Sequence, residues 1–259
     1  MQEVFSVIPG KSILAVIPAR GGSKRLHRKN ILPLGGLPLV AWSIRAARES
    51  GVLCDILVST DDQEIAEVAI AYGARVPWLR PLELASDTAS VVDVLLHDLN
   101  RYEAMVNVGI DAVMLLQPTS PYRRASTIRG AVDAFQYSNG ASIIGVSPAK
   151  THPFWCLVSD EEGGMRPFAN PDGLVLRSQD LPPVFEVNGC LYLTDAKYLR
   201  ESRSIFTKPF RPYFIEDPVE SIDIDTPFDW RVAEACLDNY EGGENERIAK
   251  GQFQSKQGN

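Results

Sequence analysis

Cysteine and histidine are scarce in this 259-residue chain, and several common nucleotide-binding motifs are missing. The four cysteines lie far apart and form no C-x-x-C pair, which excludes the usual zinc knuckles and thiol redox motifs. Neither a P-loop string, G-x-x-x-x-G-K-[S/T], nor a G-x-G-x-x-G dinucleotide fingerprint occurs. There is no apolar run of about 18 residues and no signal-peptide pattern. We therefore expect a cytoplasmic protein with no membrane partner.

The charge balance is acidic, with 26 Lys and Arg against 33 Asp and Glu and a formal net charge of −7. An acidic chain is a poor candidate for a nucleic-acid binder that relies on attraction to phosphates. Apolar residues make up 45% of the sequence and charged residues 23%, which is typical of a globular protein. The length allows one large or two small domains with a substantial core.

One stretch reverses this charge. An apolar run at 13–17, typical of a buried strand, ends at Pro18 and leads into a loop with Gly21, Gly22 and five cations within ten residues. The cations are Arg20, Lys24, Arg25, Arg28 and Lys29, and His27 is a further basic group. Glycine backbone can turn tightly and point N–H groups at an anion, and Arg and Lys add charge-assisted hydrogen bonds. We expect this loop to hold the triphosphate of a nucleotide rather than to be a solvated charged turn.

Apolar strand patterns alternate with helical patterns along most of the chain. Strands are predicted at 13–17, 56–60, 112–116, 141–146, 191–193 and 221–225. Helices are predicted at 39–50, 61–72 with Asp61 as its N-cap, 90–99, 126–137, 196–200 and from 226. This alternation predicts an α/β fold with a mostly parallel, doubly wound, Rossmann-like sheet.

The pattern changes after the fourth strand. Residues 148–186 are rich in proline and broken into short segments, which indicates an insertion of hairpins that extends at most to 215. The α/β core is then 12–147 and 187–240, and 241–259 is predicted to be a flexible tail.

A pair of acids forms the second chemical feature. On a strand, Asp223 and Asp225 would share one face and Ile224 would enter the core. Neighbouring carboxylates suit Mg²⁺, which takes further ligands from water and substrate phosphates. The alternative is a pair of exposed acids at the start of the helix after Thr226, where the helix dipole favours them. The adjacent phosphate loop favours the metal site.

Five motifs carry a resemblance to a known family. In chain order they are IPARGGSKRLHRKN, ELASDTAS, LLQPTSPYR, NGCLY and SIDIDTPFDW. Together, over about residues 12–238, they resemble the acylneuraminate (CMP-sialic acid) cytidylyltransferases. The resemblance implies that the 2-hydroxyl of a nine-carbon α-keto acid sugar attacks the α-phosphate of CTP, with Mg²⁺ as cofactor, giving the CMP-sugar and pyrophosphate. It also implies a homodimer in which the insertion reaches the partner's active site.

The resemblance also implies roles for individual residues. The catalytic set is Arg20, Lys24 and Asp225, of which Asp225 would assist deprotonation of the sugar hydroxyl. Nucleotide binding falls to Lys29 and Asn30, with cytosine read by Arg80 and the backbone of Ala89 and Ser90. The sugar would face Gln117, Tyr192 and a carboxylate clamp at Arg177, and Phe206 would be an aromatic that crosses the dimer interface. Asp223 and Asp225 would bind the metal.

Three positions depart from the family pattern: Arg25, Val91 and Trp155. They leave sialic, legionaminic and pseudaminic acids all consistent with the sequence. Two other functions were weighed. One is a glycosyltransferase that uses a D-x-D metal site and a nucleotide sugar, and the other is a non-catalytic nucleotide-binding regulator.

Overall fold

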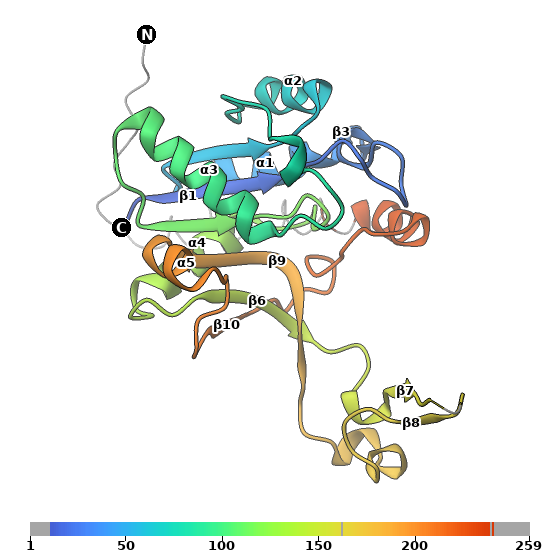
Figure 1. The fold of residues 1–259 in the computed structure, drawn as a ribbon. Coiled ribbons are helices and arrows are strands. Elements are labelled where there is room, and N and C mark those ends of the chain that lie inside the picture. Colours follow the sequence, from blue (N-terminus) through green and yellow to red (C-terminus); the bar gives the residue numbers. More distant parts are fainter. Residues whose placement is uncertain (1–10, 162, 239, 241–259) are drawn as a thin grey trace, which may run out of the picture.

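The computed structural model describes residues 11–161, 163–238 and 240. A six-stranded sheet with the order β10–β6–β9–β5–β1–β4 forms its centre (Figure 1). The strands are β1 (Ile13–Pro18), β4 (Asp55–Ser59), β5 (Ala112–Leu115), β6 (Ile143–Pro148), β9 (Phe185–Asp195) and β10 (Arg211–Phe214). Only β9 runs antiparallel to its neighbours in this sheet. The predicted mostly parallel α/β fold is confirmed.

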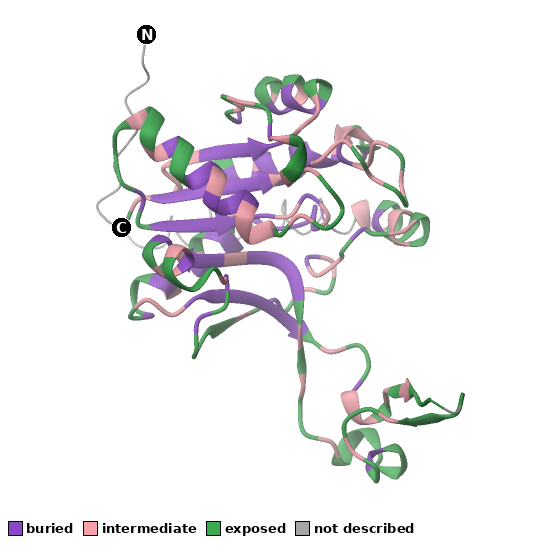
Figure 2. Ribbon diagram, in the orientation of Figure 1, coloured by how far each residue is buried: buried purple, intermediate pink, exposed green. Residues whose placement is uncertain are grey.

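Helices cover both faces of the sheet. Alternate residues of β1 divide between the two faces: Ile13, Ala15 and Ile17 pack in one cluster, and Leu14 and Val16 in the other. The first cluster includes helices α1 (Leu39–Ser50), α2 (Gln63–Ala71) and α4 (Ala125–Gln136). The second includes α3 (Val91–Val106) and α5 (Ala196–Ser202). The central strands are therefore buried on both sides (Figure 2), which explains their unbroken apolar sequences.

The insertion after β6 projects from the sheet as an arm (Figure 1). It contains the hairpin β7 (Leu157–Ser159) and β8 (Met165–Pro167) and the 3₁₀ turns η3 (Pro153–Trp155), η4 (Gly173–Val175) and η5 (Ser178–Asp180). The predicted hairpin character is confirmed, whereas the domain limits stay a prediction. The predicted tail at 241–259 lies outside the described residues. Within the described residues, no helix combines the length and apolar character needed to cross a membrane.

The predicted strand at 221–225 is wrong. Residues 222–225 have no regular secondary structure. Ile224 is nevertheless fully buried, and its N–H donates to the Thr119 carbonyl at 2.8 Å. Because a buried Ile224 stands between two acids, the sequence alternates between polar and apolar residues as a strand does. The segment nevertheless bonds to the loop at Thr119 and not to a strand. A helix follows at 227–238.

Two further boundaries differ from prediction. Asp62, not Asp61, is the N-cap of α2, because its Oδ1 accepts from the N–H groups of Glu64 and Ile65 at 2.9 and 3.1 Å. Strand β9 is longer than the predicted strand at 191–193. Its pairing with β6 is irregular close to Gly189, which has φ +75°. Such a bulge interrupts the period-two pattern by which strands are recognised in sequence.

Candidate active site

The basic loop and the acid pair meet at the carboxyl end of β1. Lys29 Nζ donates to the Ile224 carbonyl at 2.8 Å and lies 3.2 Å from Asp225 Oδ1. Arg25 Nη1 lies 3.7 Å from Asp225 Oδ2. In open α/β sheets this edge is where ligands bind. Two segments from opposite ends of the sequence thus form one charged site.

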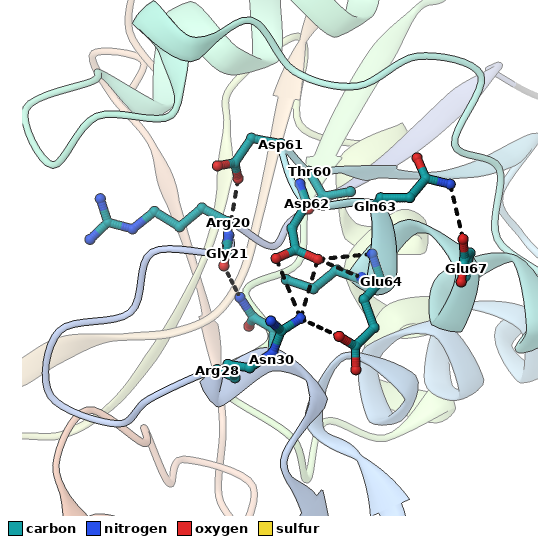
Figure 3. Close-up of polar contacts among 11 residues, drawn as sticks. Arg20, Gly21, Arg28, Asn30, Thr60, Asp61, Asp62, Gln63, Glu64 and Glu67 are labelled. Atoms are coloured by element: carbon teal, nitrogen blue, oxygen red, sulfur yellow. Dashed lines mark hydrogen bonds and ion pairs between the residues drawn. The ribbon is translucent and has the colours of Figure 1, made fainter.

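The backbone of the basic loop is held by neighbouring side chains (Figure 3). The Gly21 N–H donates to Asp61 Oδ1 at 3.0 Å, and Asn30 Nδ2 donates to the Arg20 carbonyl at 2.9 Å. A Cβ on Gly21 would stand 2.8 Å from Asp62 Oδ2, so this close approach requires glycine. In Figure 3 the Arg20 side chain extends away from these anchoring contacts.

Arg28 serves as another anchor of the loop. It has φ 53° in the left-handed region and pairs with Glu64 Oε2 at 2.6 Å and with both oxygens of Asp62 at 3.4 Å. These contacts attach the loop to the first turn of α2. Arg28 is therefore engaged in structure, whereas the loop's other cations face different carboxylates.

Asp87 brings together the two cations predicted to hold the triphosphate. Its Oδ1 lies 2.8 Å from Arg20 Nη1, and its other oxygen pairs with Lys24 Nζ. The hydrogen bond from Lys24, together with the charges of Lys24 and Arg20, lowers the pKa of the Asp87 carboxyl. Sequence reasoning missed Asp87, although it lies within the ELASDTAS motif. The two cations converge on one anionic group.

The two acids have different surroundings. Burial raises the pKa of Asp223, and the charge of Asp225 adds to this rise, while a hydrogen bond from Thr119 and the charge of Lys29 oppose it. The backbone N–H groups of Asp225 and Thr226 donate to Asp229 Oδ2 at 3.0 and 2.7 Å, which fixes the start of the helix.

This donor set fits a divalent cation that completes its coordination elsewhere. Among the described residues, no group of three or more His, Cys, Asp or Glu side chains could hold a metal. Asp223 and Asp225 would thus supply two oxygen ligands, and water and phosphate oxygens the rest, which is the usual coordination of Mg²⁺ at substrate sites. A cation there would also relieve the repulsion between the two carboxylates.

Arg80 is buried, and all three nitrogens of its guanidinium bond to protein oxygens. Nε donates to Ser59 Oγ at 3.0 Å, Nη2 to the Ser59 carbonyl, and Nη1 to the Leu84 carbonyl at 3.4 Å. Burial lowers the pKa of Arg80. These bonds fasten the segment that leads to Ala89 and Ser90 onto the end of β4. The role of Arg80 in reading cytosine stays a prediction.

Of the residues predicted to face the sugar, Tyr192 lies on β9 and Gln117 lies in the loop that follows β5. Tyr192 pairs in register with Leu115 at the end of β5, two residues before Gln117. Burial raises the pKa of Tyr192, and the charge of Asp223 adds to the rise, which relates this tyrosine to the acid pair. The Phe206 ring packs edge-on against Tyr192 with centroids 6.0 Å apart.

Arg177 lies elsewhere. It is exposed and precedes η5 in the arm, which Figure 1 shows extending away from the basic loop. A single chain does not bring Arg177 to the other site residues. Its role as a sugar clamp stays a prediction that depends on a second copy of the chain.

Comparisons with known proteins agree with the geometry. The cytidylyltransferase family matches residues 14–246. A CMP-N,N'-diacetyllegionaminic acid synthase of Legionella pneumophila is 43% identical over 227 residues, which cover 87% of this chain and 96% of the relative. A pseudaminic acid cytidylyltransferase of Campylobacter jejuni is 33% identical over 220 residues, or 85% of this chain and 94% of the relative.

A solved CMP:2-keto-3-deoxy-manno-octonic acid synthetase, complexed with CTP, has a TM-score of 0.65 at 18% identity. The match covers 88% of this chain and 99% of that structure, and it supports the fold. The six-stranded sheet and the charged site at its carboxyl edge are together typical of a nucleotidyltransferase with a doubly wound α/β fold. The chain belongs to the cytidylyltransferase family, in the branch of the nonulosonic acid cytidylyltransferases. The resemblance inferred from sequence is confirmed, and the glycosyltransferase and regulator alternatives lose their support.

The Asp87 ion pairs lead to a first prediction. Replacing Lys24 with Ala should raise the pKa of the Asp87 carboxyl toward its ordinary value, because the largest favourable partner of the carboxylate is lost. Carboxyl ¹³C NMR titration of the two proteins would measure the change. Lys197→Ala, which removes an exposed i,i+4 pair on α5, is the matched control. An Asp87 titration that is the same in Lys24→Ala and in the control would contradict the pairing.

Proposed function

We propose that this protein transfers CMP from CTP to the 2-hydroxyl of a nonulosonic acid and releases pyrophosphate. The observation that carries the proposal is the meeting of the basic loop with Asp225 at the carboxyl edge of the sheet, in a chain of the cytidylyltransferase family. Phosphoryl-transfer enzymes act mainly by positioning their substrates and by neutralising charge on the phosphates. This edge provides fixed cations for that purpose.

The pair of Arg20 and Lys24 provides the phosphate contacts. Both side chains pair with the Asp87 carboxylate. We infer that the triphosphate of CTP takes the place of this carboxylate. Lys29, which lies next to Asp225, adds a third cation where the leaving pyrophosphate gains charge.

The acid pair provides the metal ligands. Asp223 and Asp225 would hold Mg²⁺, which when bound polarises the α-phosphate and neutralises the leaving group. Asp225 would assist the loss of the proton from the sugar hydroxyl, because its carboxylate lies beside the cationic loop that is proposed to hold the phosphates.

The sugar is proposed to be N,N'-diacetyllegionaminic acid. One relative named for that product is 43% identical to this chain, a second relative with the same printed name is 31% identical, and one named for pseudaminic acid is 33% identical. The 43% identity to the first of these, over 87% of this chain, is the observation that supports the legionaminic configuration.

We further propose a homodimer formed through the arm. Apolar side chains on the arm stay exposed in the single chain, among them Val175 at 83%, Met165 at 69% and Phe168 at 67%. Exposed apolar patches of this kind mark interfaces. A second copy is the proposed occupant, because Arg177 reaches a sugar site only if the arm extends to a partner. The cytoplasmic location stays a prediction, in keeping with the four free cysteine thiols.

The substrate assignment predicts the outcome of a direct assay. Pyrophosphate release from CTP should be fastest with N,N'-diacetyllegionaminic acid in a panel that also contains N-acetylneuraminic and pseudaminic acids. Product identity would be established by mass spectrometry. UTP serves as the control nucleotide. No release with any nonulosonic acid would reject the proposed reaction, and a preference for another acid would reject only the sugar.

The metal assignment predicts a separate result. EDTA should abolish turnover and Mg²⁺ should restore it, and Asp223→Asn or Asp225→Asn should lower turnover by about 100-fold or more. Calorimetry should also show weaker Mg²⁺ binding to the two variants in the presence of CTP. Asp238→Asn, on an exposed position of the following helix, is the control. Full activity in EDTA, or normal metal binding by both variants, would count against the site.

The proposed homodimer leads to a prediction about the mass of the protein in solution. Sedimentation equilibrium at micromolar concentration should give twice the 28.6 kDa chain mass. Val175→Asp should shift the equilibrium toward the monomer, because it places a charge in the proposed interface. Glu201→Asp, at an exposed position of α5, is the control. A monomeric wild-type protein would reject the proposal.

A further inference from the structure

The edge predicted to face the sugar is built around a buried arginine that sequence reasoning overlooked. Arg123 follows β5 and has no solvent exposure. Its Nη2 donates to the Gln117 carbonyl at 3.0 Å, its Nη1 to Ser43 Oγ at 3.0 Å, and its Nε to the Cys190 carbonyl. Each nitrogen of the guanidinium therefore has one acceptor.

The three acceptors come from three different elements. Ser43 belongs to α1, Gln117 follows β5, and Cys190 lies in β9. Ser43 Oγ also donates to the Gln117 carbonyl at 3.3 Å, so this carbonyl receives two hydrogen bonds. A planar guanidinium presents its donors in a fixed fork, which a lysine ammonium does not reproduce. Arg123 thus fixes the relative positions of the loop after β5 and of β9.

Arg123 bonds to β9 at Cys190, in the part of the strand where the pairing with β6 is irregular. The pairing of β6 with β9 jumps from Ile144–Tyr192 to Val146–Val187, and Cys190 lies in the extra length. Gly189, in the same segment, would place a Cβ only 2.7 Å from Gln117 Oε1. The Gln117 side chain therefore lies against this backbone. A bulge changes the direction of neighbouring side chains, and Tyr192 follows it directly along the strand.

We propose that Arg123 is a positioning residue for the acceptor sugar. It fixes Gln117 and Tyr192 relative to one another through the Gln117 and Cys190 carbonyls, while the nucleotide contacts lie on the basic loop. The proposal rests on the proposed function, since it takes Gln117 and Tyr192 to face the sugar. Its consequence is selective: disturbance of the Arg123 bonds raises KM for the sugar and leaves KM for CTP nearly unchanged.

A residue that is only part of the core gives a different result. A core defect lowers thermal stability and affects both substrates alike, or neither. The two KM values therefore distinguish positioning from packing, which a measurement of total activity does not.

The experiment compares two variants with two matched controls. Ser43→Ala removes one acceptor of Arg123, and Ser50→Ala removes another buried serine hydroxyl of α1, which bonds only within its helix, to the Ala47 carbonyl. Arg123→Lys breaks the fork, and Arg124→Lys alters the adjacent buried arginine, which pairs with Asp217 at 2.6 Å. KM for each substrate and Tm are measured for every protein with pyrophosphate detection.

Ser43→Ala should raise KM for the sugar by about threefold to fivefold, as expected for one hydrogen bond. Arg123→Lys should raise it by about tenfold or more, because several bonds change at once. KM for CTP should stay within about twofold of wild type in both, and the controls should shift Tm without shifting the ratio of the two KM values.

If a variant changes the two KM values equally, or if its KM for the sugar matches that of its control, the positioning role is overturned. The proposed function still stands in that case, provided that the wild-type protein turns over. If Arg123→Lys fails to fold, Ser43→Ala decides the matter alone. A wild-type protein that releases no pyrophosphate with any nonulosonic acid overturns the proposed function, and this inference with it.

Discussion

The structure depends on the neutralisation of five cations crowded into ten residues. Such a group repels itself, and the fold gives each cation a carboxylate drawn from another segment. Arg28 pairs with the start of α2, Arg20 and Lys24 share Asp87, and Arg25 and Lys29 share Asp225. These pairs hold the basic loop in one shape, and a site with a fixed shape loses less conformational entropy when a ligand binds.

These pairs differ in how easily they exchange. The Asp87 and Asp225 side chains are about half exposed, at 42% and 53%, and ion pairs in such positions contribute roughly 0–1 kcal/mol. The phosphate groups of CTP carry enough negative charge to compete with contacts of that size. Arg28 has more contacts to the helix start and stays with the scaffold. One loop thus combines Arg28, which anchors it, with cations such as Arg20 and Lys24 whose carboxylate partner is exposed and held weakly.

The sequence was sufficient for the framework and for the charged edge, but not for the contacts between distant segments. Strands β1, β4 and β5 are buried on both faces, so the sequence shows them as apolar runs, and the cations of the glycine-rich loop after β1 are close together in the sequence. Ile224 misled because burial alone produced the alternation of a strand. Asp87 was missed because an ion pair between segments far apart in the chain leaves no local pattern. The first half of β9 was not predicted as strand because its bulge interrupts the period-two pattern.

Arginines show most clearly why residue type alone does not assign a role. Arg20, Arg80 and Arg123 all lie near the carboxyl edge of the sheet. Arg20 extends toward an exposed carboxylate, whereas Arg80 and Arg123 donate to backbone and hydroxyl oxygens. Arg80 ties the segment before Ala89 to β4, and Arg123 ties the loop after β5 to β9. Each buried arginine thus fixes one stretch of backbone at this edge of the sheet. Because buried guanidinium groups hold these stretches of backbone, Arg20 and Lys24 are the cations whose exposed carboxylate partner a competing anion can replace most easily.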